Sequence, residues 1–253
     1  MIGCILQARM GSTRLPKKIL MHLNSIETVL SFGIKQIQNC TMIDKLVVAT
    51  TDLAEDDEIT DYISKLNVEC FRGSATDVLD RYYSCAKKFA FSTIVRITSD
   101  CPLIDPTIID KVVSEFLKNK DHIDYISNVH PRTFPHGMDV EVFSFTSLEN
   151  AWFNAKKHTE REHVTPYFYT NNRFKMDNIS NPINLSHLRC TLDYKQDLDL
   201  IKEIISQIQK RPILMDDILN LFSSKPQLSK INENIPQDGG TEKSLKKDVG
   251  LLN

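Results

Sequence analysis

The first half of the chain alternates short apolar runs with amphipathic stretches. A short apolar run with polar residues at both ends is typical of a buried strand, and apolar residues three and four positions apart are typical of a helix. The first predicted strand is a short run that begins at Ile2, and the next three are 45–50, 68–71 and 93–98. The predicted helices are 27–39, 56–66, 78–89 and 107–118. Four alternating pairs indicate a doubly wound α/β domain with a mostly parallel sheet.

The second half has a different pattern. The predicted strands are 124–128, 138–143, 174–179 and 187–191. The predicted helices are 145–157, 158–171 (or a helix and then a turn at Pro166), 195–210, 215–222 and 227–232. Alternation within 138–143 puts Asp139 and Glu141 on one face, which is either a solvated edge or a functional surface. We expect one domain over 1–235, with a polar C-terminal tail over 236–253 that is loosely attached or bound by a partner.

Composition narrows the class of protein. The chain has 253 residues, enough for one large α/β domain. Its net charge of −2 gives no general attraction to nucleic acid or to an anionic membrane. No apolar run approaches the roughly 20 residues of a membrane span, and the start of the chain has no signal-peptide pattern, so a cytoplasmic protein is expected. The six cysteines form no C-x-x-C pair and are predicted to be reduced.

The loop after the first predicted strand is dense in cations and hydroxyls. It holds Arg9, Arg14, Lys17 and Lys18 within ten residues, together with Gly11, Ser12 and Thr13. Glycine lets backbone N–H groups approach an anion, and arginine makes paired charge-assisted bonds to phosphate. Ligands of open α/β sheets collect at the carboxyl ends of the strands. The loop therefore predicts a polyphosphate site, the alternative being a basic surface loop without a ligand.

Two aspartates follow predicted strands, Asp100 after 93–98 and Asp193 after 187–191. Near a phosphate loop they could hold Mg²⁺, which takes one or two protein carboxylates and keeps several waters. The alternative is that Asp100 caps a turn and Asp193 caps a helix. No G-x-G-x-x-G or G-x-x-x-x-G-K-[ST] pattern follows the first strand, which argues against a dinucleotide fold or a P-loop.

Together, these residues resemble the motifs of a known enzyme family. The run Gln7 to Pro16, with Lys18 two positions on, resembles the opening signature of cytidylyltransferases that activate acidic sugars, such as CMP-KDO synthetase and acylneuraminate cytidylyltransferase. The chain is more similar still to the family of spore coat polysaccharide biosynthesis protein F, over roughly 1–235. The later blocks that match are 72–74, 77–83, 96–103, 137–143, 161–166 and 189–194. In one departure, Lys17 stands where the related synthetases usually have Gly.

The resemblance implies a glycosyltransferase-A-like α/β fold, that of nucleotide-diphospho-sugar transferases, with helices on both faces of the sheet and a small β insertion. It implies Arg14, Lys18 and Asp100 as catalytic residues, and Asp100 and Asp193 as Mg²⁺ ligands. The implied nucleotide-binding residues are Gln7, Ala8, Arg9, Gly11, Ser12, Arg14, Lys18, Thr50, Asp52, Arg72, Gly73, Ser74, Asp77, Thr98 and Ser99. The candidates for the acceptor site are Asp139, Glu141, Arg161, Glu162 and His163.

The implied activity is transfer of CMP from CTP to an anionic sugar or a sugar or polyol phosphate, with release of pyrophosphate, for a surface glycan. Arg161 suits an anionic acceptor, and His163 is a general base or a core histidine. Segment 128–172, including 138–143 and Tyr167–Tyr169, could support a homodimer, as in the related synthetases. Two alternatives remain, a glycosyltransferase and a non-catalytic nucleotide-binding subunit. A glycosyltransferase would commonly carry a D-x-D motif, and the close match here is Asp197-Leu198-Asp199 on a predicted helix.

Overall fold

The computed structural model describes residues 1–236 and residue 248. One seven-stranded sheet has the order β3-β2-β1-β4-β6-β5-β7. The strands are β1 (Ile2–Gln7), β2 (Lys45–Thr51), β3 (Glu69–Gly73), β4 (Thr93–Thr98), β5 (Tyr125–Ser127), β6 (Glu141–Ser144) and β7 (Met176–Asn178). The first four strands are parallel, β6 is antiparallel to both β4 and β5, and β5 is parallel to β7. The prediction of a mixed, mostly parallel sheet is confirmed.

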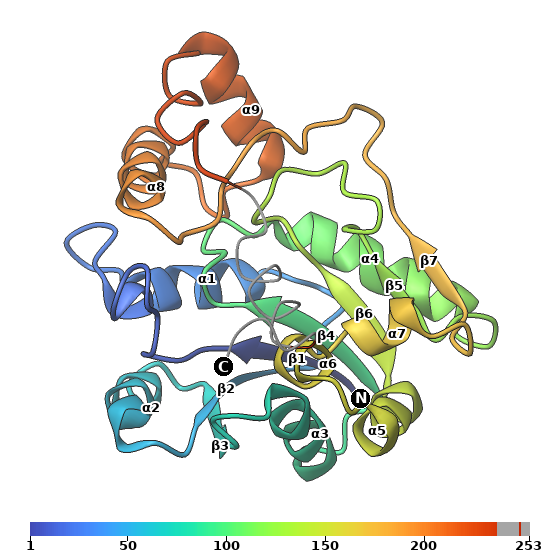
Figure 1. Cartoon of the computed structure of the whole chain (residues 1–253). Helices are drawn as coiled ribbons and strands as arrows, with labels where there is room; N and C mark the ends of the chain where they lie inside the picture. The colour runs from blue at the N-terminus through green and yellow to red at the C-terminus, as the bar shows by residue number, and fades with distance from the viewer. Residues whose placement is uncertain (237–247, 249–253) are drawn as a thin grey trace.

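Helices cover both faces of the sheet (Figure 1). In Figure 1, α1 and α4 lie on one side with α8 and α9 beyond them, and α3 and α5 lie on the other. The longer helices are α1 (Val29–Ile37), α2 (Asp57–Ser64), α3 (Val78–Lys88), α4 (Pro106–Asn119), α5 (Phe145–Asn154), α8 (Lys195–Gln207) and α9 (Met215–Ser224). The short ones are η1 (Lys18–Leu20), η2 (Ala54–Asp56), α6 (His158–His163) and α7 (Pro166–Thr170).

Local sequence fixes where the helices begin. The Thr28 hydroxyl accepts from the Ser31 N–H at α1, and the Asp77 carboxylate accepts from the Asp80 N–H at α3. Asp105 caps α4, and Pro106 occupies its first turn as predicted. The apolar faces of the helices and sheet form two clusters of buried residues, one on each face. The sheet is therefore a rigid platform whose polar strand ends are free to form a site.

Two predictions from the second half are wrong, and one of two alternatives is excluded. Segment 187–191 is not a strand and makes one isolated bridge, between Arg189 and His136. It crosses the ends of the sheet strands, where the Leu192 N–H donates to the Asp100 carbonyl at 2.8 Å. Segment 227–232 forms turns instead of a helix. Segment 138–143 is no solvated edge, because β6 lies between β4 and β5.

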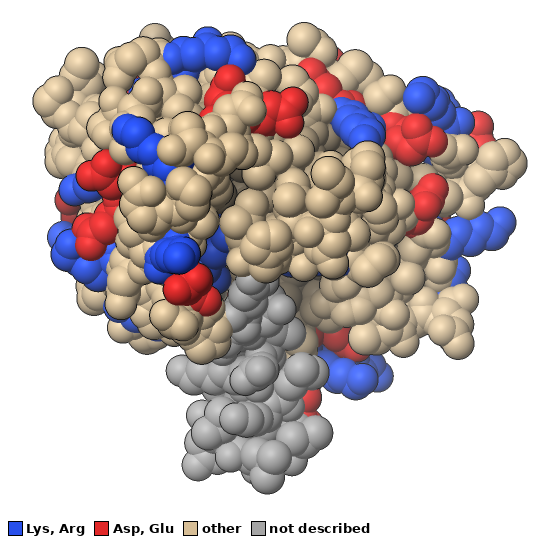
Figure 2. Space-filling model, turned by 90° about the horizontal axis from the view of Figure 1, so that it is seen from above, with Lys and Arg blue, Asp and Glu red and all other residues tan. Residues whose placement is uncertain are grey.

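Other expectations concern the chain as a whole. All six cysteines are unpaired thiols. Within the described residues, no helix is long and apolar enough to cross a membrane. On the face shown in Figure 2, basic and acidic side chains are interspersed. The predicted tail lies mostly outside the described residues, but the Asp248 carboxylate accepts a hydrogen bond from the Thr159 N–H at 3.0 Å, at the start of α6.

Candidate active site

A cavity of about 580 Å³ opens at the carboxyl ends of β1 and β4. The predicted phosphate loop, the turn after β4, α6 and the segment before α8 all contribute to its wall. The predicted site residues that line it are Gln7, Arg9, Gly11, Ser12, Arg14, Lys18, Thr98, Ser99, Asp100, Glu162, His163 and Asp193. The structure thus brings the loop, both predicted metal ligands and two acceptor candidates together, although they come from opposite ends of the sequence.

One aspartate that the sequence analysis did not single out holds the loop in place. The buried Asp56 accepts hydrogen bonds from the Met10 N–H at 2.7 Å and from the Thr51 N–H at 3.0 Å. It also accepts from the Thr50 hydroxyl at 2.9 Å. Asp56 therefore ties the loop after β1 to the end of β2, which keeps the cavity wall in one conformation.

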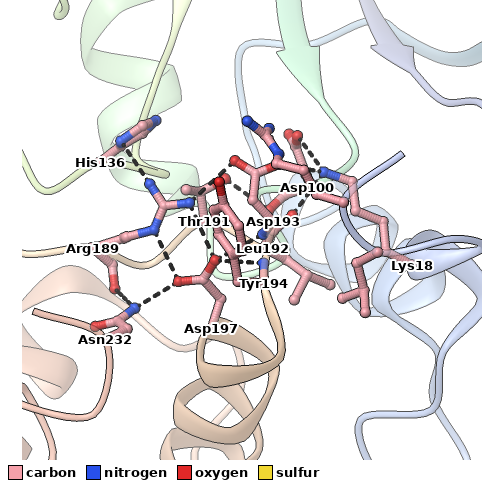
Figure 3. A network of polar contacts seen from close by, with 12 residues as sticks. Lys18, Asp100, His136, Arg189, Thr191, Leu192, Asp193, Tyr194, Asp197 and Asn232 are labelled. Atoms are coloured by element: carbon pink, nitrogen blue, oxygen red, sulfur yellow. Dashed lines mark hydrogen bonds and ion pairs between the residues drawn. The ribbon is translucent and has the colours of Figure 1, made fainter. Parts of the chain in front are cut away.

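Lys18 joins the two predicted metal ligands (Figure 3). Its Nζ donates to Asp100 Oδ2 and to Asp193 Oδ1, each at 2.9 Å, and to the Leu192 carbonyl at 2.7 Å. The Lys18 side chain keeps only 11% of its surface exposed. All three N–H donors of the ammonium group are thus used, and the two carboxylates converge on one point.

The charges of this cluster stabilise one another. Although burial opposes it, Asp100 and Asp193 raise the pKa of Lys18. Against the same opposition, Lys18 holds the pKa of Asp100 well below its usual range. The pKa of Asp193 is also lowered. Burial and the charge of Asp100 act to raise it, but Lys18 and Arg14 outweigh them. At neutral pH the cavity therefore holds ionised carboxylates and an ammonium group.

A second layer of contacts orients Asp193 from behind (Figure 3). Arg14 donates to Asp193 Oδ1 at 2.6 Å, and the buried Arg189 donates to Oδ2 at 3.1 Å. Arg189 also donates through Nε to Asp197 Oδ1 at 2.9 Å. Asp197 in turn accepts from Asn232 Nδ2 at 2.8 Å and from the Asp193 N–H at 2.8 Å. Both carboxylate oxygens of Asp193 are therefore fixed by hydrogen bonds.

Gly137 permits the close contact behind Arg189. Its φ of 103° lies in the left-handed region, and a Cβ there would come within 2.6 Å of the Cys190 backbone. The neighbouring His136 carbonyl accepts from the Cys190 N–H at 2.7 Å. This packing holds segment 187–191 across the strand ends, and so holds Asp193 over the cavity.

The donor set fits a divalent cation of the magnesium type. The carboxylates of Asp100 and Asp193 lie within 2.9 Å of one shared atom, Lys18 Nζ. Proteins usually contribute one or two carboxylates to such a site, and water and phosphate oxygens fill the remaining positions. Among residues 1–236 and 248, no group of three or more His, Cys, Asp or Glu side chains gathers to hold a metal by itself.

Several predicted nucleotide-binding residues lie outside the cavity wall. Thr50 is fully buried against Asp56, and Arg72 pairs with Asp57 at 2.5 Å and donates to the Thr51 carbonyl at 3.1 Å. The others outside the wall are Ala8, Asp52, Gly73, Ser74 and Asp77. The Ser74 hydroxyl accepts from the Asp77 N–H, and the Asp77 carboxylate accepts from the Asp80 N–H and from Arg161, so these polar side chains have structural partners.

The acceptor candidates divide in the same way. Glu162 and His163 line the cavity. Arg161 turns away from it and donates through Nε to Asp77 at 2.9 Å. Asp139 pairs with Arg132, with Nη2 at 2.8 Å from Oδ2, and Glu141 is buried in the sheet. Burial lowers the pKa of His163 against the opposing charge of Glu162, which favours a neutral imidazole.

The cavity wall also contains residues that the sequence analysis did not assign to the site. Arg96 comes from the middle of β4, and Tyr194 lies under the Arg14 guanidinium, with 5.4 Å between its ring centre and Arg14 Cζ. An arginine inside an otherwise apolar predicted strand was the available signal for Arg96. Tyr194 ends the matching block 189–194, but the resemblance assigned it no role.

Lys17 occupies a backbone position that favours glycine. Its φ of 57° lies in the left-handed region, where a side chain is strained. Its Nζ lies 2.9 Å from Glu58 Oε2, in an exposed pair, and Lys17 does not line the cavity. Backbone geometry thus accounts for the glycine of related synthetases, and the Lys17 side chain neither crowds the cavity nor reaches into it.

We expect Lys17→Gly to leave nucleotide binding within about twofold of wild type. Glycine relieves the left-handed strain, which stabilises the folded protein, but it also gives the unfolded chain more freedom, which destabilises the fold. Because the two effects offset each other, the free energy of unfolding should change by less than about 1 kcal/mol. Urea unfolding and CTP titration measure the two quantities. Lys17→Ala is the control, because it keeps the strain and loses the Glu58 contact. A tenfold loss of CTP affinity in Lys17→Gly would contradict the assignment of this side chain to the surface.

Comparisons with known proteins agree on one class. A family model described as Cytidylyltransferase matches residues 3–221. The uncharacterized protein MJ1063 of Methanocaldococcus jannaschii is 38% identical over 92% of this chain and 95% of its own. Spore coat polysaccharide biosynthesis protein SpsF of Bacillus subtilis is 29% identical over 88% of this chain and 94% of its own. A solved cytidylyltransferase from Leptospira borgpetersenii is 35% identical, with a TM-score of 0.87 over 93% of this chain and 98% of that one.

The fold is that of a nucleotidyltransferase, as the resemblance implied. The chain belongs to the cytidylyltransferase family. The match to the family model covers the loop, both predicted metal ligands and α6, so every part of the cavity wall lies inside it.

Proposed function

We propose that this protein transfers CMP from CTP to an anionic sugar or a sugar or polyol phosphate, with Mg²⁺ as cofactor and release of pyrophosphate. One observation carries the proposal: Arg14, Lys18, Asp100 and Asp193 converge at the carboxyl ends of β1 and β4, in a polar cavity of about 580 Å³. The SpsF relative, named for spore coat polysaccharide biosynthesis, supports a role in making a surface glycan.

The loop cations have a direct use in this reaction. An acceptor oxygen attacks the α-phosphorus, and negative charge grows on the departing pyrophosphate. Arg14 and Lys18 supply preformed positive charge at the cavity wall, and Lys18 is largely buried there, where such charge is most effective. In the structure both cations pair with Asp193, so entry of the triphosphate exchanges a protein partner for a phosphate partner.

Asp100 and Asp193 are the proposed ligands of Mg²⁺. When bound, the ion neutralises phosphate charge and fixes the orientation of the phosphates. The two carboxylates are kept ionised by Lys18, so no proton has to leave before a metal binds. Arg189 donates to the Asp193 carboxylate, and the Asp193 N–H donates to Asp197. These two hydrogen bonds keep the Asp193 carboxylate directed into the cavity.

The acceptor is proposed to enter from the side of α6. Glu162 and His163 line that wall. The lowered pKa of His163 leaves its imidazole free of charge at neutral pH, and a neutral imidazole can take a proton from an acceptor hydroxyl. His163 is therefore the proposed general base where the attacking group is a hydroxyl; an acceptor that attacks through a phosphate oxygen does not require one.

The glycosyltransferase alternative receives no support from the D-x-D match. Asp197 is fully buried, pairs with Arg189 and accepts from backbone N–H groups at the start of α8. Asp199 lies on the exposed face of α8, 2.6 Å from Lys195. The two carboxylates have separate structural partners and do not line the cavity.

A pyrophosphate-release assay tests the proposal. The purified protein is incubated with Mg²⁺, each of the four NTPs, and a panel of sugar acids and sugar phosphates. We expect release with CTP and an anionic acceptor, and no release with either substrate alone. In a parallel reaction with a nucleotide sugar in place of the NTP, release of nucleoside diphosphate would favour a glycosyltransferase. No release with any NTP and acceptor, in a protein that still binds CTP, would favour a non-catalytic subunit.

A further inference from the structure

Arg96 is a charged residue in the interior of the sheet. It lies on β4 between β1 and β6, in register with Ile5 on one side and Glu141 on the other. The rest of the Thr93–Ile97 stretch is buried and uncharged. A charge in this position requires a partner, because burying it alone is costly.

Glu141 supplies that partner and is itself fixed by a third residue. A carboxylate oxygen of Glu141 contacts Arg96 Nη1, and the other accepts from the Tyr125 hydroxyl at 2.6 Å. Glu141 and Tyr125 lie on the neighbouring strands β6 and β5. Tyr125 is 1% exposed, so the arrangement is held by the sheet and by core packing.

The guanidinium group of Arg96 has more donors than this pair uses. In the part of the chain that the structure describes, Nη1 makes the one side-chain hydrogen bond of Arg96, and Nε is buried without a partner. The side chain keeps 15% of its surface exposed and lines the cavity. Among the described residues Nη2 makes no hydrogen bond either, and it is not one of the fully buried atoms, so it is the donor that Arg96 can offer to a ligand in the cavity.

The position of Arg96 suits the acceptor more than the triphosphate. Arg14 and Lys18 lie in the loop beyond the strand end, beside Asp100 and Asp193. Arg96 lies inside β4, two residues before the strand ends at Thr98, whereas Asp100 lies in the turn that follows. Its charge also contributes to lowering the pKa of His163, which burial lowers most, so the two side chains face the same part of the cavity.

We propose that Arg96 binds the anionic group of the acceptor, and that Glu141 and Tyr125 are positioning residues that hold its guanidinium. The planar fork of arginine matches a carboxylate or a phosphate with two parallel hydrogen bonds. This inference rests on the proposed function and extends it, because it assigns the acceptor's charge to one side chain. It also changes the expected role of Glu141 from contacting the acceptor to orienting Arg96.

The test compares Arg96→Gln with wild type in the pyrophosphate assay. The probes are 3-deoxy-manno-octulosonate and its neutral amide, which share one attacking hydroxyl, and glycerol 3-phosphate, which has no neutral partner because its phosphate is also the attacking group. For the anionic probe that the wild type uses, we expect the acceptor KM to rise about 10- to 100-fold, the effect of losing a charge-assisted contact. The KM for CTP should stay within about twofold. Activity with the neutral amide should be equal in the two proteins.

Two further variants separate binding from folding. Arg96→Gln leaves Glu141 buried without its partner, so the double variant Arg96→Gln/Glu141→Gln removes both charges and restores a neutral sheet. We expect it to unfold near the wild-type midpoint and still show the raised acceptor KM. Tyr125→Phe leaves both charges in place, and should raise the acceptor KM less than tenfold with the CTP KM unchanged.

The outcomes are distinct. A folded double variant with a wild-type acceptor KM overturns the inference, and so does an equal rise in the CTP and acceptor KM values, which would indicate a structural ion pair alone. Loss of discrimination between the acid and its amide supports a carboxylate acceptor, and a raised KM for glycerol 3-phosphate with an unchanged KM for CTP supports a phosphate. If the wild type releases no pyrophosphate with any acceptor, the proposed function fails and this inference fails with it.

Discussion

Replacing Asp100 with alanine should lower turnover about 100- to 1000-fold while the protein remains folded. A charged group that binds the metal and stabilises the reacting phosphates has effects of this size when it is removed. The fold should survive because Lys18, the buried partner of Asp100, keeps Asp193 and the Leu192 carbonyl at 2.9 and 2.7 Å. Initial rates at saturating CTP and acceptor, together with thermal unfolding followed by circular dichroism, measure both parts of this prediction.

Two variants make this result specific. Asp100→Asn keeps the shape of the side chain and removes its charge, so it should be nearly as inactive as Asp100→Ala. Asp199→Ala removes a carboxylate that pairs with Lys195 on the exposed face of α8, and it should retain wild-type turnover. Binding of Mn²⁺ in the presence of CTP, followed by electron paramagnetic resonance, should weaken in both Asp100 variants. Near-normal turnover of Asp100→Ala would refute the assignment of this residue to the metal.

Replacing Arg189 with methionine should cost about 3–5 kcal/mol of unfolding free energy, the usual cost of leaving a buried charge without its partner. The Arg189 side chain is 3% exposed and pairs with Asp197, which is fully buried, and with Asp193. Although burial opposes it, these two carboxylates raise the pKa of Arg189, so the group is charged throughout the neutral range. Methionine fills a similar volume and removes only the charge and its hydrogen bonds.

Equilibrium unfolding in urea measures this loss. The matched control is Lys195→Met, which breaks an exposed pair with Asp199 in the same segment of the chain and should change stability by less than about 0.5 kcal/mol. Arg189→Met should also lower turnover, because Asp193 Oδ2 loses the donor that orients it. A loss below 1 kcal/mol would mean that the Asp197 contacts to Asn232 and to backbone N–H groups suffice to hold this region.

The parallel half of the fold could be predicted because its information is local. The apolar runs that become β1, β2 and β4 are bounded by polar residues, and the loop cations follow β1 directly. Since parallel strands end at the same edge of a sheet, the meeting of Lys18 and Asp100 follows from topology alone.

The remaining contacts depend on pairings that no local pattern specifies. Glu141 meets Arg96 because β6 joins the sheet antiparallel to β4 in one particular register, and a shift by one residue would turn the two side chains to opposite faces. Arg189 was placed on a strand, but its guanidinium donates to the buried Asp197 and its backbone carbonyl accepts from Asn232, so these contacts replace those of a sheet. Asp56 gave no signal because its partners at Met10 and Thr51 come from two separate strand ends.

The strand β4 carries Arg96 within the sheet and ends at Thr98, two residues before Asp100, so one short stretch of backbone connects two side chains that line the cavity. The spacing between the proposed metal at Asp100 and the proposed acceptor anion at Arg96 is then limited by a strand and by a tight turn, in which the Cys101 N–H donates to the Thr98 carbonyl at 3.2 Å. Acceptors would be selected by the length between their attacking oxygen and their charged group. Chemically different sugars of equal length would thus be alternative substrates, whereas a homologue one carbon shorter would be a poor one.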